Sequence, residues 1–223
     1  MSTTLNSNSW KAISKVSKAG KAGNYWSVGD VKYEYLYYNV PTLFNIADFN
    51  VDDNNSITFT VGNQLDKYYA LAKSSINNDF FDGTVYKFLT NDVLPNMPFK
   101  NYIREVSKEV YDWASRLRTY SVKIFCFSCY EVYGSYSWTK GKEGKKQYSY
   151  YKAGNLTKHW VDRTGGSQYT YEEGWWLRSV ARNTIALLFS SPYDNNNPRS
   201  NIPSYSEGYE GDGSMVAAFG FVI

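Results

Sequence analysis

The sequence predicts an α+β protein with small twisted antiparallel sheets, one or two helices and long loops. Aromatic residues make up 18% of the 223 residues, and 22 residues are tyrosine. This composition is typical of strands and of recognition surfaces. Short apolar segments recur between turns rich in Gly, Asn and Ser, whereas helical spacing of apolar residues occurs near the N-terminus and in the middle of the chain.

The N-terminal part is expected to hold one helix followed by strands. Apolar residues at helical spacing predict a helix over Trp10–Ala19, which Gly20 and Gly23 end. YWSVGD and VKYEYLYYNV are predicted to form a strand pair across Tyr25–Tyr38, and Pro41 is expected to break the run. Asp52–Asn55 is a turn by composition, and strands are predicted on either side of it, over 43–50 and 56–61.

The middle of the chain is expected to be helical and the last third to be strands and loops. Asp79 or Asp82 is placed to cap a helix that runs through Phe81–Leu89, and a second short helix is predicted over Phe99–Ile103. Later strands are predicted over 106–110, 122–128, 175–178, 185–189 and 215–222. Residues 191–213 form a long irregular insertion, and loops of this length are usually functional or disordered.

The chain contains no internal repeat and no linker that would divide it. We therefore expect one domain over residues 24–223. The polar segment 1–23 is predicted to be an arm that anchors the chain to a partner subunit or packs against its own domain.

Charge and hydropathy argue against two classes of partner. Lys and Arg number 24 against 21 Asp and Glu, a net charge of +3, so a concentrated nucleic-acid-binding face is not expected. The basic stretch Lys140–Gln147 contains glycines and a glutamate, which indicates a solvated loop. No run of about 18 apolar residues and no apolar leader is present, so membrane insertion and signal-peptide export are not expected.

Cysteine and histidine usage argues against a disulfide and a zinc site. Cys126 and Cys129 lie in FCFSCY, which looks like a strand, so the two side chains would point to opposite faces. His159 is the only histidine, which leaves a zinc site short of ligands. Both cysteines are expected to be reduced and structural.

Several separated segments resemble one family. These segments are Trp10–Asp30, residues 84–98, Tyr130–Gly134, Glu143–Tyr151, Gly174–Ser179 and Ala217–Ile223. Their order and spacing resemble a C-type-lectin-like domain family of gut bacteria and their phages, which carries a W-L-R-S motif and a C-terminal apolar strand. The chain departs from this family at Val180, where a proline is common, and at Ala217-Ala218, where many members have an arginine.

The resemblance implies a C-type-lectin-like fold but no catalytic activity. The broader fold includes formylglycine-generating enzymes, whose catalytic cysteines have no counterpart in the last third of this chain. In GWWLRSV, one of Trp175 and Trp176 is expected to face the core, and Arg178 to pair with a carboxylate such as Glu131. The motif is therefore interpreted as structural, and a sugar platform is the alternative.

Aromatic residues in the loops are the candidate binding residues. Aromatic faces stack on sugar rings, and Tyr, Ser, Asn and Gly together form adaptable recognition surfaces. Packing between subunits of a symmetric homo-oligomer explains the same residues equally well. The candidates are Tyr136, Trp138, Tyr193, Tyr205 and Tyr209.

No cofactor is expected, with calcium left open as an alternative. Oxygen-rich clusters at Asp52–Asn55 and at Glu207, Glu210 and Asp212 could supply ligands, but neither follows a calcium-loop pattern. Turns are also rich in Asp and Asn for backbone reasons.

Catalysis is not expected. His159 has no nucleophile in a recognisable elbow, and pairs drawn from Glu131, Glu172 and Glu173 are no more than a chain of this length normally offers. The favoured function is a non-enzymatic structural protein on a phage particle, made in the host cytoplasm and displayed as a head fibre, decoration or tail-tip protein. It would contact other virion subunits and a host-surface glycan or protein. The alternative is a bacterial carbohydrate-binding or adhesion module.

Overall fold

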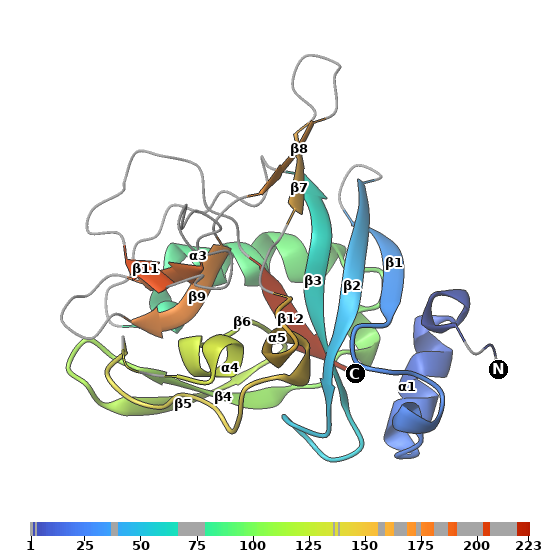
Figure 1. Ribbon diagram of the computed structural model, residues 1–223, viewed down its shortest axis with the longest axis horizontal. Coiled ribbons are helices and arrows are strands. Elements are labelled where there is room, and N and C mark those ends of the chain that lie inside the picture. Colours follow the sequence, from blue (N-terminus) through green and yellow to red (C-terminus); the bar gives the residue numbers. More distant parts are fainter. Residues whose placement is uncertain are drawn as a thin grey trace.

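The computed structural model describes most of the chain (Figure 1). The described residues are 2, 4–36, 40–66, 79–135, 137, 139–155, 159–162, 169–172, 175–180, 187–190, 203–205 and 218–223. They form a mixed α+β protein with three sheets and a few short helices, which confirms the predicted class. None of the helices within these ranges is long and apolar enough to cross a membrane.

The largest sheet has seven strands and holds the centre of the molecule. Its main path runs β1-β2-β3-β12-β6, and every neighbouring pair on this path is antiparallel. β7 pairs with β3 in parallel and carries β8 on its other side. The strands are β1 (Val31–Leu36), β2 (Val40–Phe49), β3 (Ile57–Asp66), β6 (Ile124–Cys126), β7 (His159–Asp162), β8 (Tyr169–Glu172) and β12 (Phe219–Val222).

Two smaller antiparallel sheets complete the fold. One is the hairpin of β4 (Val106–Tyr111) and β5 (Leu117–Val122), and the other has the order β11-β10-β9. The strands of the second are β9 (Trp175–Val180), β10 (Leu187–Ser190) and β11 (Pro203–Tyr205). Figure 1 shows the hairpin extending away from the large sheet on the side opposite α1.

The helices are short. Ser9 caps α1 by accepting a hydrogen bond from the Ala12 amide at 3.2 Å, and Gly20 leaves the helix with a φ of +68°. The α-helices are α1 (Trp10–Lys18), α3 (Thr84–Phe88), α4 (Cys129–Tyr133) and α5 (Ser149–Lys152). Single turns and a π-helical segment are η1 (Leu5–Ser7), η2 (Ala22–Asn24), η3 (Phe80–Asp82), η4 (Leu89–Val93), η5 (Leu94–Asn96) and η6 (Lys100–Tyr102).

An aromatic cluster joins α1 to the large sheet. The Trp10 ring stacks on Phe99 at 4.0 Å between centroids and meets Phe59 edge-on at 5.3 Å. Ser17 Oγ donates to the carbonyl of Ile223 at 2.7 Å. Of the two outcomes expected for segment 1–23, packing against its own domain is therefore observed over α1. An additional role as an anchor for a partner stays a prediction.

Three local expectations were wrong: a strand over YWSVGD, a break at Pro41 and a strand that runs to residue 128. YWSVGD forms no strand, because the Asp30 carboxylate accepts from the Ser27 amide and Gly29 takes a φ of +91°, so the segment turns. Pro41 does not break the run but lies inside β2, opposite Tyr35 of the edge strand β1.

The expected strand over 122–128 ends at Cys126. Ser128 accepts from the Glu131 amide at 3.1 Å, Glu131 accepts from the Ser128 amide at 3.0 Å, and this capping box starts α4. Cys129 therefore lies in a helix, and both cysteines are buried and free as expected.

Candidate functional site

Arg178 of β9 lies at the centre of a buried charge network. Its side chain is 0% exposed, and Nη1 lies 2.5 Å from Glu131 Oε2. Nη1 also donates to the Cys126 carbonyl and Nε to the Glu109 carbonyl, both at 2.9 Å. The expected pairing of Arg178 with Glu131 is confirmed, and the arginine joins β9 to α4, β6 and β4.

Lys108 of β4 supplies the second cation. Its Nζ lies 3.0 Å from Glu131 Oε1, 2.6 Å from Asp52 Oδ1 and 2.8 Å from Tyr148 Oη. The same ammonium sits 3.8 Å from the centroid of the Phe125 ring. The network therefore balances two cations with the carboxylates of Glu131 and Asp52, as buried charges require.

The two carboxylates remain ionised at neutral pH. Burial acts to raise the pKa of Glu131, but Arg178 and Lys108 outweigh it, and the pKa lies below its ordinary value. Burial likewise opposes ionisation of Asp52, and the Lys108 charge with hydrogen bonds from Lys108, Thr58 and Tyr148 lowers its pKa. These groups are consequently held as ion pairs.

Glu143 behaves differently from these two carboxylates. Its oxygens accept from the Tyr111 amide at 2.8 Å and from the Ser179 hydroxyl, both neutral donors. Burial raises the pKa of Glu143 to about 7, and Arg178 with the two hydrogen bonds counters this only in part. Glu143 is thus the member of the network that changes charge near neutral pH.

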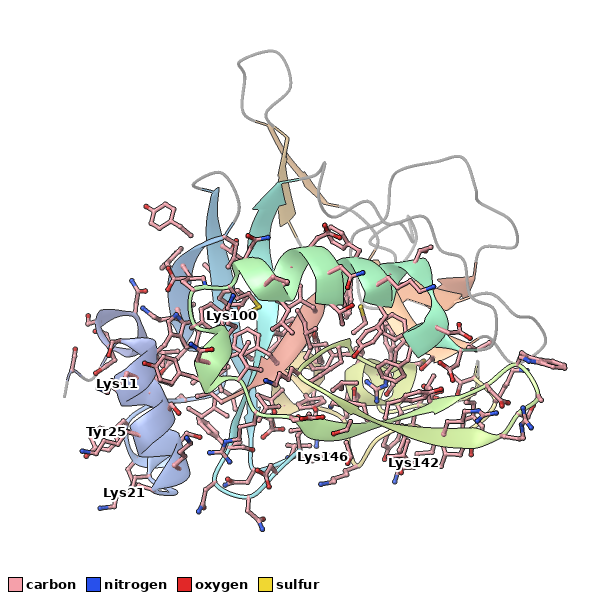
Figure 2. All side chains as sticks on the ribbon, turned by 180° about the vertical axis from the view of Figure 1, so that it is seen from behind. Lys11, Lys21, Tyr25, Lys100, Lys142 and Lys146 are labelled. Atoms are coloured by element: carbon pink, nitrogen blue, oxygen red, sulfur yellow. The ribbon has the colours of Figure 1, made fainter. Side chains whose placement is uncertain are left out.

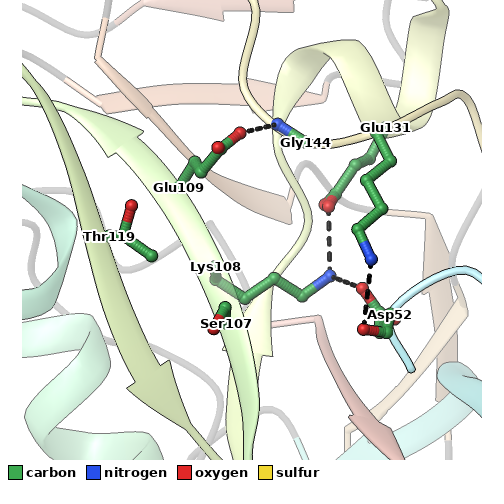
Figure 3. Close-up of a pocket in the computed structure, with 8 residues that line it drawn as sticks. Asp52, Ser107, Lys108, Glu109, Thr119, Glu131 and Gly144 are labelled. Atoms are coloured by element: carbon green, nitrogen blue, oxygen red, sulfur yellow. Dashed lines mark hydrogen bonds and ion pairs between the residues drawn. The ribbon is translucent and has the colours of Figure 1, made fainter. Parts of the chain in front are cut away.

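A small hollow opens beside this network (Figure 3). Its volume of about 100 Å³ suits a few water molecules and falls short of the several hundred Å³ of a typical small-molecule site. Gly144 forms part of the wall with a φ of +93°, and its amide donates to Glu109 Oε2 at 3.1 Å. The lining residues are Asp52, Ser107, Lys108, Glu109, Thr119, Glu131, Gly144 and Lys145.

Two ionised residues that line the hollow belong to the charge network. Lys108 and Glu131 are paired with each other and with further partners. Nearby, burial raises the pKa of the Cys129 thiol to about 12, so the sulfur stays protonated. The ion pairs of Lys108 and Glu131 thus connect β4, α4 and β9.

Two residues of the predicted structural motif, Trp175 and Arg178, lie on β9 with their side chains buried. Trp175 is buried and stacks on Tyr151 at 5.8 Å between centroids, and Arg178 is the centre of the network. The backbone of Trp176 pairs with Phe189 of β10, and the backbone of Tyr205 ends β11. The other predicted binding residues lie outside the described residues: Tyr136, Trp138, Tyr193 and Tyr209.

In the Asp52–Asn55 loop considered for calcium, the carboxylates of Asp52 and Asp53 form ion pairs with basic side chains of the protein. Asp52 is paired with Lys108, and Asp53 Oδ2 lies 3.1 Å from Arg104 Nη1. The other cluster considered, from Glu207 to Asp212, lies outside the described residues. Over the described ranges, no group of three or more His, Cys, Asp or Glu side chains is placed to hold a metal ion.

Large side chains are exposed at two places that the sequence did not single out. Tyr33 and Tyr35 lie two residues apart on the outer face of the edge strand β1, and Tyr35 is 63% exposed. Trp113, 54% exposed, and Leu117 lie at the tip of the β4–β5 hairpin. Period-two spacing in VKYEYL was the available signal for the tyrosines, whereas nothing local marks Trp113 as exposed.

The family model described as "Domain of unknown function (DUF6273)" matches residues 55–202, more than half of the chain. The chain belongs to the DUF6273 family. The match includes Lys108, Glu131, Glu143 and Arg178 of the network and also the β4–β5 hairpin. No curated protein and no solved structure matches the chain.

Proposed function

We propose that this DUF6273 protein is a non-enzymatic recognition protein with a C-type-lectin-like fold. In this proposal it is displayed on a phage particle as a head fibre, decoration or tail-tip protein and binds a glycan or protein of the host surface. The sequence resemblance supports the fold and the phage context. The structure supports the proposal through a buried charge network that holds the fold and through aromatic side chains that are exposed on the surface.

The observation that carries the proposal is the closed charge network. Glu131 was the carboxylate of α4 considered for glycoside hydrolysis, yet both of its oxygens are occupied by Arg178, Lys108 and the Ser128 amide. A general acid or nucleophile must instead face its substrate. The position of Glu131 supports a role in holding β4, β6, β9 and α4 in place.

Exposed aromatic side chains support recognition. Tyr33 and Tyr35 share one face of an edge strand, and Trp113 occupies a hairpin tip. Large aromatic side chains carry much of the binding energy when a partner covers them. These two places therefore support a recognition role.

Labelling and adsorption assays test the two parts of the proposal. Antibodies against the purified protein should decorate intact phage particles from a producing culture, and the protein added in excess should slow adsorption of those particles to host cells. Heat-denatured protein serves as the unfolded control. Label confined to bacterial cells would overturn the phage assignment, and unchanged adsorption would overturn host recognition.

A further inference from the structure

The tip of the β4–β5 hairpin is a rigid turn. The Asp112 amide donates to the Arg116 carbonyl at 3.0 Å, and the Ser115 amide donates to the Asp112 carbonyl at 2.9 Å. Ser115 takes a φ of +61°, so residues 113–115 form a three-residue loop that ends in a left-handed residue. Asp112 Oδ1 accepts from the Arg116 amide at 2.8 Å and fixes the loop further.

Asp112 also organises two arginines. Nε of Arg116 lies 2.8 Å and Nε of Arg118 lies 3.0 Å from the same oxygen, Oδ2. Burial acts to raise the pKa of Asp112, but these two guanidinium groups and the Arg116 amide hold it at about 2, so the carboxylate is always charged near neutrality. Within the described part of the chain, the terminal Nη groups of both arginines have no hydrogen-bond partner.

The remaining charge at the tip is positive. Arg116 is 62% exposed in its side chain and Arg118 is 39% exposed, and the carboxylates that act on Arg118 are those of Asp112 and Asp79. Lys140 adds a third cation, because its Nζ donates to the Trp113 carbonyl at 2.8 Å. The Trp113 ring follows Asp112 directly in the chain and is itself exposed. An exposed indole side chain and two guanidinium groups held by Asp112 thus lie at the same end of the hairpin.

We propose that this tip binds a carboxylate-bearing sugar residue of a host-surface glycan, an inference that rests on the proposed recognition function. A guanidinium group matches a carboxylate through two parallel N–H donors, and the free Nη groups are available for it. The apolar face of a sugar ring packs on an indole ring. A neutral sugar would pack on Trp113 but would offer no carboxylate to pair with the guanidinium groups.

Single-stranded nucleic acid is the competing anionic ligand, and the tip suits it less well. Binding of a nucleic-acid strand relies on successive stacking platforms along a basic groove. The tip presents one exposed indole beside a compact pair of arginines, and the net charge of the whole chain is only +3. One stacking face and one anion site correspond to a single acidic sugar.

Calorimetric titration of the full chain with two matched probes tests this inference. The probes are an oligogalacturonate and its methyl ester, which keeps the sugar rings and removes the charges. Trp113→Ala and Arg118→Ala should each weaken oligogalacturonate binding about tenfold or more, and the ester should bind as weakly to the parent protein. Lys11→Ala is the control, because Lys11 lies on α1 at the side opposite the hairpin (Figure 2). This control should bind like the parent protein.

A screen of the parent protein on arrayed glycans and single-stranded oligonucleotides distinguishes failure of the tip site from failure of glycan recognition. Glycans bound without preference for acidic sugars, or acidic sugars bound equally by both tip variants, would overturn the site and leave glycan recognition standing. No glycan bound at all would overturn both the site and glycan recognition. Oligonucleotide binding that the tip variants lose would assign the tip to nucleic acid. Superimposable circular dichroism spectra of parent and variants verify that each comparison concerns folded protein.

Discussion

In two clusters of this protein one carboxylate accepts from two cations, and the surroundings of the two clusters are opposite. At the centre, Glu131 accepts from Arg178 and Lys108, and at the hairpin tip, Asp112 accepts from Arg116 and Arg118. The joining distances are similar, from 2.5 to 3.0 Å inside and from 2.8 to 3.0 Å at the tip. The cations inside are shielded from water, and those at the tip are not.

This difference shows that distance alone does not set the contribution of an ion pair. Removing one partner of a buried pair leaves a charge without water or counter-charge, whereas an exposed partner is replaced by solvent. The central cluster therefore acts on the stability of the fold. The tip cluster orients groups that remain available to a ligand.

Arg178→Met is expected to have the largest effect. It removes the main counter-charge of Glu131 and leaves the Cys126 and Glu109 carbonyls without their donors. The free energy of unfolding should fall by about 3–5 kcal/mol. Urea-induced unfolding followed by circular dichroism measures this loss. A loss below about 1 kcal/mol would mean that the central cluster contributes no more than a surface pair.

Glu143→Gln is expected to alter how stability depends on pH. The folded protein raises the pKa of Glu143 from 4.5 to about 7, so it holds this proton more tightly than the unfolded chain does. Stability from this group is complete below pH 4.5 and declines as pH rises through 7, by about 3 kcal/mol in total. Gln mimics the protonated acid and should remove that decline.

Urea unfolding of the parent protein and Glu143→Gln at pH 5, 6, 7 and 8 measures the difference. Glu131 and Asp52 have lowered pKa values, so they lose their contribution on acidification and do not change over this range. Parallel curves for parent and variant would contradict the assignment of Glu143 as the titrating group.

Gly144→Ala tests how closely the wall of the hollow fits the network. A Cβ at Gly144 would lie 2.8 Å from Glu131 Oε1, on a backbone with a φ of +93°. We expect a loss of about 2 kcal/mol or more in thermal or urea unfolding. Gly154→Ala is the matched control, because its φ is +92° but nothing lies within 4 Å of the added Cβ. Equal losses would mean that backbone conformation, and not the fit against Glu131, decides the effect.

Arg118→Met is expected to have the smallest effect on stability. It makes the same chemical change as Arg178→Met, but the Arg118 side chain is 39% exposed, and Arg116 still neutralises the buried Asp112 carboxylate. Its unfolding curve should superimpose on that of the parent protein. A loss comparable with that of Arg178→Met would show that the tip is part of the structural core and would weaken its assignment to a ligand.

The sequence predicted the parts of the structure that depend on local pattern. The spacing of Ile13, Val16 and Ala19 predicted α1. The strand over GWWLRSV predicted that one of the two tryptophans and Arg178 lie inside, and the structure shows that the buried tryptophan is Trp175. The helix at Cys129 was missed although its signal was present. Ser128 and Glu131 have the spacing of a capping box, and this outweighed the apolar run in FCFSCY.

Most of the central network could not be predicted because its members come from distant segments. Lys108 and Asp52 are 56 residues apart, and Ser179 and Glu143 are 36 apart. No periodicity specifies which carboxylate meets which cation across such distances. The tip is the reverse case: its ion pairs are local, but the exposure of Trp113 depends on how the hairpin leaves the rest of the molecule.

The position of β12 has a consequence for how the chain reaches this structure during synthesis. β12 lies between β3 and β6 and pairs with both, although it follows every other described element in the chain. On the ribosome, β3 and β6 are made long before the strand that joins them. Until translation has passed residue 222, the large sheet therefore remains open at its middle, with the backbone N–H and C=O groups on the facing edges of β3 and β6 unpaired.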